Sequence, residues 1–218
     1  MVMVAVLGTG IVGQTLAPRA AEVGYDVTVG ARSADSPSLE LFAGRPGIGV
    51  GSFADAAAAA SLVINATNGL HSVAALELAG EANLRDKTLL DVANELEPVE
   101  GGFPRPVASY GNSLGQRIQS AFSETHVVKA LNTMNCRIMA DPSLVPGDHI
   151  VFLSGDSPDA KADVARLLRD FGWRDSQLID LGGIETAAAT EMMMAVWMRV
   201  RLARGMDAPP FNWAINSG

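Results

Sequence analysis

A glycine-rich turn near the start of the chain restricts the possible fold more than any other feature. The segment Gly8-Thr9-Gly10-Ile11-Val12-Gly13 follows an apolar run at 1–7 and precedes an Ala/Leu-rich stretch at 14–23. In a strand–turn–helix unit the first glycine allows a sharp turn, the second lets the backbone approach a pyrophosphate, and the third lets the helix pack against the strand. The phosphates then face the positive N-terminus of the helix. The turn predicts a dinucleotide site, and a glycine-rich turn in some other α/β domain is the alternative.

The end of the second predicted strand indicates which dinucleotide binds. Asp26–Gly30 is typical of a short buried strand, and Ala31-Arg32-Ser33 follows it, where an NAD-specific fold carries Asp or Glu against the ribose 2′-hydroxyl. A carboxylate there would repel a 2′-phosphate. Arg32 can instead form charge-assisted, bidentate hydrogen bonds to phosphate, and the Ser33 hydroxyl can donate one more. We therefore expect NADP(H) as the cofactor, with a solvated loop charge as the alternative interpretation of Arg32.

Length, charge and cysteine content narrow the class of protein. The chain has 218 residues, 24 acidic and 16 basic side chains, and a formal net charge of −8. This length suits one large α/β domain or a dinucleotide domain with a small appendix. The negative charge disfavours nucleic-acid and anionic-membrane partners. The single cysteine cannot form an internal disulfide, and neither a secretory signal nor a membrane-spanning stretch is visible, so we expect a cytoplasmic protein.

Apolar strands and helices alternate along the chain. Strands are predicted at 1–7, 26–30, 47–50, 61–65, 87–92, 126–131, 149–154 and 176–181. Helices are predicted at 14–23, 37–44, 53–60, 73–79, 113–121, 157–171 and 184–203. The helix from Ser157 is well signalled, since Ser157, Pro158 and Asp159 supply a cap, a first-turn proline and a first-turn acid. The alternation predicts an α/β fold of Rossmann type, with a doubly wound, mostly parallel sheet.

Two parts are expected within this fold. Residues 1–135 would form an NADP-binding Rossmann domain, and residues 136–218 a small C-terminal α/β domain that closes the active site. The last predicted helix is apolar nearly all the way round, because Met192-Met193-Met194 precede Val196, Trp197 and Met198. We expect this helix to be buried on several sides and to provide a candidate homodimer face.

The loops after strands four, five and six should face the nicotinamide, because an open α/β sheet binds ligands at the carboxyl ends of its strands. These loops supply Ala66, Thr67, Asn68 and His71; Asn94; and Asn132, Thr133, Met134, Asn135 and Cys136. They carry neutral polar groups and show neither metal-ligand spacing nor a carboxylate pair, so no metal is expected. Direct hydride transfer depends on positioning the two reactants and excluding water more than on a proton donor. The residue pattern thus suits redox chemistry.

Three side chains near these loops have more than one interpretation. His71 could donate a proton near neutral pH, or it could simply contact the cofactor. Cys136 could be a nucleophile, but no base is paired with it in the sequence, which favours a small neutral wall residue. Lys129 ends a strand and could reach a substrate anion, although a surface lysine is the commoner outcome. No catalytic residue is certain from the sequence.

Several of these segments together resemble the F420-dependent NADP oxidoreductases. The resemblance is carried by the opening GTGIVG, the turn Gly30–Ser33, the segment Val128–Thr133, Ser154-Gly155-Asp156 followed by Asp159-Ala160-Lys161, and Phe171-Gly172-Trp173 before Leu178–Gly182. It runs nearly end to end. The resemblance implies a usually dimeric enzyme that passes hydride directly between NADP(H) and the deazaflavin coenzyme F420, without an acid or base residue.

The resemblance also implies roles by position. Gly8, Thr9, Gly10, Ile11, Val12, Gly13, Arg32 and Ser33 would take the adenine-ribose phosphate and the pyrophosphate. Ala66, Thr67, Asn68, His71 and Asn94 would lie by the middle of the cofactor, and Asn132–Cys136 beside the nicotinamide and the second ring. The chain departs from the family at Asn68, where a proline is frequent, and in having no Lys or Arg between Arg174 and Arg199. Because F420 is an anion, Arg105, Arg117 or Lys129 would have to hold it.

Two other functions remain open at this point. One is an NADPH-dependent reductase of a small imine or carbonyl substrate, although such enzymes usually add a large helical domain, for which the roughly 80 residues after Asn135 are too few. The other is a non-catalytic protein that senses the redox state of NADP(H). It would bind the cofactor tightly and turn over no acceptor.

Overall fold

One eight-stranded sheet organises the chain. The computed structural model describes residues 2–216, so Met1, at the start of the first predicted strand, and Ser217 and Gly218, at the end of the predicted second domain, lie outside the described residues. The strand order is β10-β9-β8-β5-β4-β1-β2-β3. The strands are β1 Met3–Leu7, β2 Asp26–Ala31, β3 Ile48–Ser52, β4 Leu62–Asn65, β5 Thr88–Asp91, β8 His126–Ala130, β9 Val151–Ser154 and β10 Leu178–Asp180. A short hairpin, β6 Leu96–Glu97 and β7 Arg105–Pro106, forms a separate ladder.

The sheet is mostly parallel, and the chain reverses its direction of winding beside β1. Strands β3, β2, β1, β4, β5 and β8 pair in parallel, whereas β9 runs antiparallel to β8 and is itself parallel to β10. Leu7 at the end of β1 pairs with Gly30 of β2 on one side and with Asn65 of β4 on the other. Ligands bind at such a switch point, outside the carboxyl ends of the strands. The expected Rossmann-type, doubly wound architecture is confirmed.

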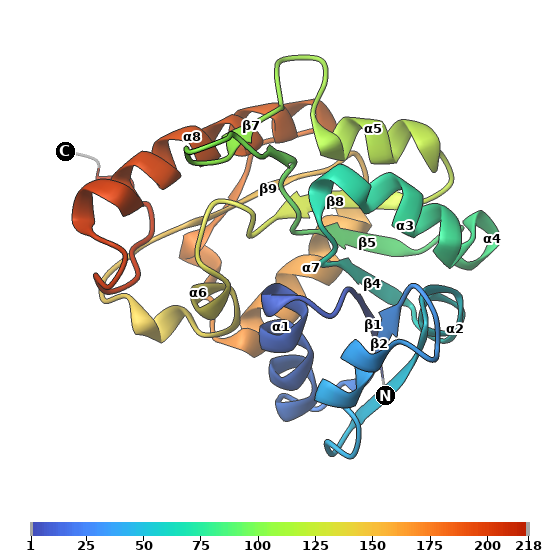
Figure 1. Ribbon diagram of the computed structural model, residues 1–218. Coiled ribbons are helices and arrows are strands. Elements are labelled where there is room, and N and C mark those ends of the chain that lie inside the picture. The colour runs from blue at the N-terminus through green and yellow to red at the C-terminus, as the bar shows by residue number, and fades with distance from the viewer. Residues whose placement is uncertain (1, 217–218) are drawn as a thin grey trace.

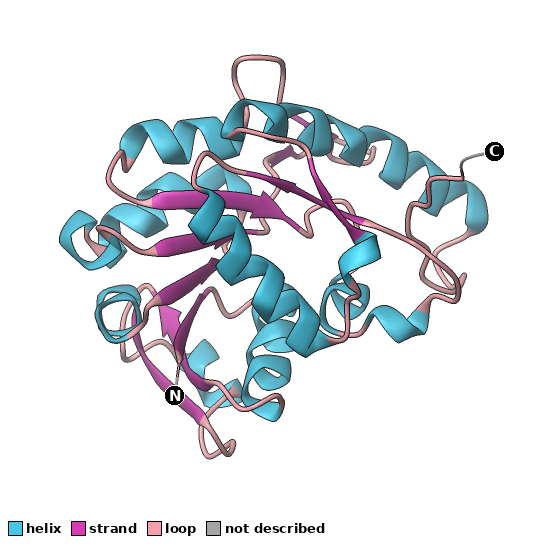
Figure 2. Cartoon of the chain, turned by 180° about the vertical axis from the view of Figure 1, so that it is seen from behind, coloured by secondary structure: helices cyan, strands magenta, loops and turns pink. Residues whose placement is uncertain are grey.

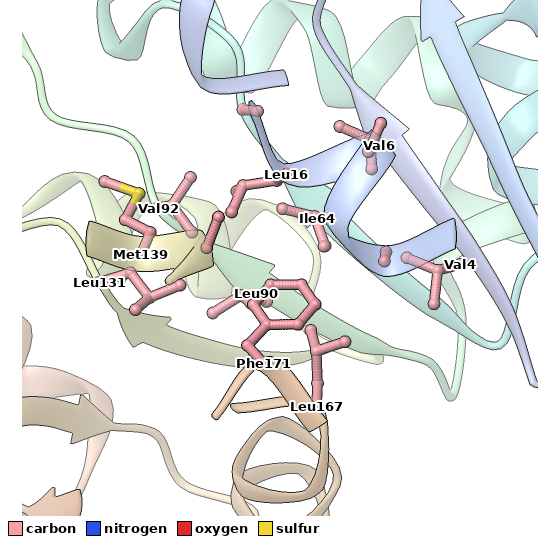
Figure 3. Close-up of a cluster of buried hydrophobic side chains, with 14 of the residues drawn as sticks. Val4, Val6, Leu16, Ile64, Leu90, Val92, Leu131, Met139, Leu167 and Phe171 are labelled. Atoms are coloured by element: carbon pink, nitrogen blue, oxygen red, sulfur yellow. The ribbon is translucent and has the colours of Figure 1, made fainter. Parts of the chain in front are cut away.

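Helices cover both faces of the sheet (Figures 1 and 2). The α-helices are α1 Ile11–Glu22, α2 Phe53–Ala59, α3 Ser72–Ala79, α4 Glu81–Leu84, α5 Leu114–Ala121, α6 Cys136–Ala140, α7 Pro158–Phe171 and α8 Ala187–Arg204. One core packs α1, α6 and α7 against the sheet, and Figure 3 shows Leu16, Ile64, Leu90 and Phe171 meeting there. The second core packs α2, α3 and α5 against the opposite face. Strands buried on both faces explain their nearly continuous apolar sequences.

Local signals account for several helix starts. Ser52 and Asp55 form a capping box at α2, and Ser113 and Gln116 form another at α5. The Ser157 side chain accepts a hydrogen bond from the backbone N–H of Ala160 at α7, as its sequence predicts. The short helix predicted at 37–44 is present as a 3₁₀-helix, and it ends earlier than predicted, at Leu41. Gly44, at φ 74, cannot continue a helix there.

The two predicted parts of the chain share the sheet. Strands β9 and β10 lie beyond residue 135 and belong to the same sheet, next to β8. The division at residue 135 stays a prediction. Within the described residues, no helix has the combined length and apolar character needed to cross a membrane.

The last helix is present, but the expected burial on several sides is wrong for the single chain. Helix α8 lies beside α5 and β7 (Figure 1), and buries Thr190, Glu191, Met194 and Met198. Its outer side leaves Val196 54% and Met192 37% exposed. The helix covers one edge of the molecule, so within residues 2–216 it packs through one side only.

The Tyr25 side chain forms a pH-dependent hydrogen bond that links the α1–β2 turn to α7. Its hydroxyl donates to Asp170 Oδ2 at 2.5 Å, and burial together with this carboxylate raises the pKa of Tyr25 to about 12. A raised pKa means that the neutral phenol stabilises the folded state below pH ~10 and that this stabilisation is lost as the pH rises from ~10 to ~12.

We expect Tyr25→Phe to lower the free energy of unfolding by about 1 kcal/mol at pH 7 and to flatten the fall in stability between pH ~10 and ~12. Urea unfolding of both proteins across this pH range measures the effect. An unchanged alkaline profile in the variant would contradict it.

Candidate functional site

The glycine turn brings the backbone of three segments into close contact at the switch point. Gly8 has φ +122, and a Cβ placed on it would lie 2.5 Å from the carbonyl oxygen of Ala66. A Cβ on Gly13 would lie 2.0 Å from the carbonyl oxygen of Gly8, so α1 packs directly on the turn. Gly10 is the N-cap of α1, no side chain caps the helix, and a Cβ on Gly10 would meet open space. The uncapped start of α1 is therefore free to take an anion.

A cleft of about 500 Å³ opens beside this turn. Eight of the predicted cofactor-binding residues and seven other residues line it. The predicted ones are Gly8, Thr9, Gly10, Arg32, Ala66, Thr67, Asn68 and His71. The others are Ala31, Ser36, Ser38, Phe53, Ala74, Ala75 and Leu78. Ile11, Val12, Gly13, Ser33 and Asn94 do not line it; Val12 packs against the core and Gly13 lies behind Gly8.

Arg32 and a group of hydroxyls form one wall of the cleft. Arg32 is exposed and makes no ion pair or side-chain hydrogen bond with any residue in 2–216. Thr9 Oγ1 donates to Ser38 Oγ at 2.8 Å, and the Ser36 and Ser38 hydroxyls are 2.9 Å apart. Ser33, the predicted partner of Arg32, instead accepts from the Asp35 N–H at 3.3 Å. A cation and adjustable hydroxyls together suit a phosphate group.

Ser36 and Ser38 were not among the predicted site residues. The signal that could have found them is the run Ser33-Ala34-Asp35-Ser36-Pro37-Ser38, in which three hydroxyls follow the arginine. The 3₁₀-helix at Pro37–Leu41 turns this run back toward Thr9.

The loop after β4 forms the opposite wall. Thr67 donates from its Oγ1 to Asn65 Oδ1 at 2.6 Å, and Asn68 Oδ1 accepts from the Leu70 N–H at 3.0 Å. His71 is exposed in the same cleft as Arg32, and none of residues 132–136 lines this cleft. The location favours a contact with the cofactor over a proton donor at the reacting ring.

The predicted substrate-side residues lie together at the carboxyl end of β8. Asn132 and Asn94 bind each other reciprocally, with Asn132 Nδ2 donating to Asn94 Oδ1 at 3.0 Å and Asn94 Nδ2 to the Asn132 carbonyl at 2.7 Å. Leu131 adopts φ +65, a left-handed conformation that is uncommon for leucine. The adjoining Asn132, Thr133 and Met134 are buried. This loop is therefore shielded from water and held in one conformation.

Asn135 and Cys136 follow in the same loop and begin α6. Asn135 caps the helix, since its Oδ1 accepts from the Arg137 N–H at 2.9 Å. Cys136 is half-buried, and Thr15 Oγ1 lies 3.5 Å from its sulfur. Within residues 2–216, no basic side chain forms a hydrogen bond with the Cys136 thiol. This favours a small neutral residue beside the reactants over a nucleophile.

Lys129 is neither a surface lysine nor free to reach a substrate. It is 1% exposed, and its Nζ lies 2.8 Å from Asp91 Oδ2 and 2.9 Å from Glu191 Oε1. Burial alone lowers the pKa of Lys129, but the two carboxylates more than offset this and hold the pKa above its ordinary value. Both expectations for this residue are wrong, because α8 closes over the end of β8 and brings Glu191 to it.

The other two cations proposed for an anionic acceptor are also paired. Arg105 binds Glu97 at 2.7 Å, and Arg117 binds Glu95. Two other arginines, Arg137 and Arg201, line a cavity of about 240 Å³ together with Asn135 of the substrate loop. Arg137 forms no ion pair within the described part of the chain. In residues 2–216, no group of three or more His, Cys, Asp or Glu side chains could hold a metal ion.

Comparison with known proteins places this site in a family. The family model described as NADP oxidoreductase, coenzyme F420-dependent, matches residues 3–95. The crystal structure of a candidate F420-dependent NADP reductase from Arthrobacter sp. FB24 is 43% identical, with a TM-score of 0.90 over 98% of this chain and 99% of that one. The chain belongs to the coenzyme F420-dependent NADP oxidoreductase family. A search of curated proteins finds no match.

Membership makes the chain an NADP-dependent oxidoreductase and confirms the resemblance drawn from its motifs. More distant structures share the fold alone. An imine reductase from Streptomyces aurantiacus is 18% identical, with a TM-score of 0.64 over 94% of this chain and 62% of that one. A 3-hydroxyisobutyrate dehydrogenase from Mycobacterium tuberculosis is 14% identical, with a TM-score of 0.65 over 93% and 62%. This member of the F420-dependent family is thus much shorter than those enzymes.

Proposed function

We propose that the protein transfers hydride directly between NADP(H) and coenzyme F420, or a similar flat acceptor. The observation that carries the proposal is the cleft at the glycine turn, in which Arg32 has no partner among residues 2–216 and stands beside the hydroxyls of Thr9, Ser36 and Ser38. Membership of the F420-dependent NADP oxidoreductase family supports the same pair of reactants.

The fit of NADP(H) to this cleft rests on its open and polar walls. The open space beside Gly10 and the uncapped start of α1 suit the pyrophosphate. Arg32, with Ser36 and Ser38, would hold the 2′-phosphate, and Thr67, Asn68 and His71 would lie along the middle of the cofactor. When bound, NADP(H) supplies the hydride or takes it up.

The chain's own part in the reaction is to orient the reactants and exclude water. Asn132, Thr133 and Met134 are at most 4% exposed and lie in the loop after β8, beside which the nicotinamide is expected. Hydride transfer between two stacked rings needs close, fixed geometry and no proton donor. The neutral character of this loop therefore agrees with the proposal.

Arg137 and Arg201 support an acceptor that carries negative charge. They line the cavity next to Asn135 together with Asp207, and Arg201 also donates hydrogen bonds to the Met206 and Ala208 carbonyls. A phosphate or carboxylate tail of the acceptor would find its cations there rather than at Arg105, Arg117 or Lys129. We therefore propose Arg137 and Arg201 as the cations for the acceptor, in place of Arg105, Arg117 and Lys129.

Arg32→Ala is expected to remove about 2 to 3 kcal/mol of the preference for NADPH over NADH, because the charge-assisted contact to the 2′-phosphate is lost. Titration of the purified proteins with each nucleotide measures this. Arg45→Ala is the matched control, since Arg45 is also exposed and does not line the cleft. Equal binding of both nucleotides by the unmodified protein would overturn the NADP(H) assignment.

The acceptor is tested by adding F420 to the protein with NADPH and following the deazaflavin absorbance. Reduction of F420 supports the proposal. Binding of NADPH without reduction of F420, but with turnover of a small imine or carbonyl compound, would point to a reductase of those substrates. Tight NADPH binding with no turnover of any acceptor would point to a sensor of NADP(H).

We also propose that the protein works in the cytoplasm as a homodimer with small-molecule reactants. The exposed apolar side chains Met192 and Val196 on α8 support self-association. The single cysteine suits a reducing compartment, and the net charge of −8 disfavours nucleic acid.

A further inference from the structure

A continuous chain of buried polar groups runs from α8 to the cofactor cleft. Glu191 binds Lys129, Lys129 binds Asp91, Asp91 binds Asn65, and Asn65 binds Thr67. The first four are each at most 2% exposed, and Thr67 lines the cleft. Buried groups of this kind are costly unless every donor and acceptor is satisfied, so their geometry is well defined.

Asp91 is the centre of this chain. Its carboxylate accepts from Lys129 Nζ at 2.8 Å, from Asn65 Nδ2 at 2.9 Å and from the Ala93 N–H at 3.1 Å. An ionised carboxylate can only accept hydrogen bonds. Asn65 must therefore turn its amino group toward Asp91, and its oxygen is left facing the other way.

The Asn65 oxygen in turn sets the conformation of Thr67. It accepts from Thr67 Oγ1 at 2.6 Å and from the Thr67 N–H at 3.3 Å. The Ser72 hydroxyl lies 2.8 Å from Thr67 Oγ1 and 3.3 Å from the Asn68 carbonyl oxygen, so both of its partners belong to the same loop. One amide orientation thus fixes the start of the cofactor loop.

Burial raises the pKa of Asp91, and the Lys129 ammonium group at the far end of the chain counteracts this rise. Lys129 also donates to the Ala93 carbonyl at 2.5 Å, and it shares its charge with Glu191. Glu191 accepts from the N–H groups of Leu114 and Gly115, at 2.8 and 3.0 Å, at the start of α5. The positive helix end compensates the second carboxylate, so Lys129 is left to neutralise Asp91.

We propose that Asp91 is a positioning residue that fixes the cofactor loop, residues 66–71, by orienting the amide of Asn65 toward Thr67. The inference rests on the proposed function, in which this cleft binds NADP(H). Asp91 itself touches neither reactant and acts through two intervening residues.

The test is a double-mutant cycle on NADPH affinity. In Asp91→Asn a single amide oxygen replaces the two carboxylate oxygens that accept from Asn65, the Ala93 N–H and Lys129, so the orientation of the Asn65 amide is no longer enforced. We expect the dissociation constant of NADPH to rise about tenfold in Asp91→Asn, the equivalent of one buried hydrogen bond. Thr67→Val should show a similar rise, and the double variant should be no weaker than the weaker single one. Rises that multiply in the double variant would overturn the proposal.

Two further variants separate positioning from general loss of stability. Asn65→Ala breaks the link while leaving the Asp91–Lys129 pair intact, and should raise the dissociation constant as Asp91→Asn does, even if Asp91→Asn folds poorly. Thr125→Val loses a buried hydrogen bond of comparable length, 3.1 Å to the Leu84 carbonyl, outside the cleft. It should lower stability without changing NADPH affinity.

Failure of the positioning role can be distinguished from failure of the proposed function. If the unmodified protein does not bind NADPH, the proposed function fails. If it binds NADPH and neither Asp91→Asn nor Asn65→Ala alters the affinity, the positioning role alone is overturned.

Discussion

Lys129→Met is expected to lower the free energy of unfolding by about 3 to 5 kcal/mol, because it leaves two carboxylates buried without their shared cation. Asp91 and Glu191 are 0% and 2% exposed, so water cannot replace the lost ammonium group. The two negative charges would also repel each other across the space that Lys129 occupied. Urea unfolding at neutral pH measures the loss.

Lys161→Met is the matched control for this substitution. Lys161 Nζ also lies 2.8 Å from a carboxylate, that of Asp180, but the Asp180 side chain is 58% exposed. A surface pair of this kind is worth about 0 to 1 kcal/mol. Similar losses in the two variants would show that the buried position of Lys129 contributes nothing special.

Gly13→Ala is expected to abolish measurable NADPH binding and to destabilise the fold by about 1 to 3 kcal/mol, the usual effect of overpacking a buried site. The new methyl group would lie 2.0 Å from the Gly8 carbonyl oxygen, and that oxygen belongs to backbone that cannot rotate away. Either α1 or the turn must move, and both form the proposed phosphate site. Thermal unfolding and NADPH titration report the two effects separately.

Gly10→Ala distinguishes loss of the site from loss of the fold. Gly10 has φ −72, which alanine adopts readily, and a Cβ there meets no atom within 4 Å. We expect an unchanged melting temperature but weaker NADPH binding, because the methyl group would occupy the space proposed for the pyrophosphate. Wild-type affinity and stability in Gly13→Ala would contradict the close packing of α1 on the turn.

Much of the fold could be predicted because its signals are local. The cap residues of α7 lie within three positions of each other, and the apolar strands stand out against glycine-rich turns. The helix predicted at 37–44 is a 3₁₀-helix that ends at Leu41, so only its end was misplaced. The prediction failed for the burial of α8, whose apolar sequence indicates that a partner is needed but not where that partner lies.

The candidate site divides in the same way. Gly8, Arg32 and Ala66 could be placed beside one another because each directly follows a strand of one parallel sheet. Ser36 and Ser38 were missed because their role depends on how a short turn folds back toward Thr9. The pairing of Arg105 and Arg117 with acidic neighbours was not visible in the sequence either.

By itself, the sequence determined the strand–turn–helix start, the kind of sheet and the presence of a cation where a 2′-phosphate is expected, since these depend on residues close together in the chain. Only the tertiary structure decided that Lys129 is buried between Asp91 and Glu191, and that Asp91 reaches the cofactor loop through Asn65. The physical reason is that a contact between distant residues forms when helices and strands pack, and the free energy of a buried charge depends on which groups that packing brings to it.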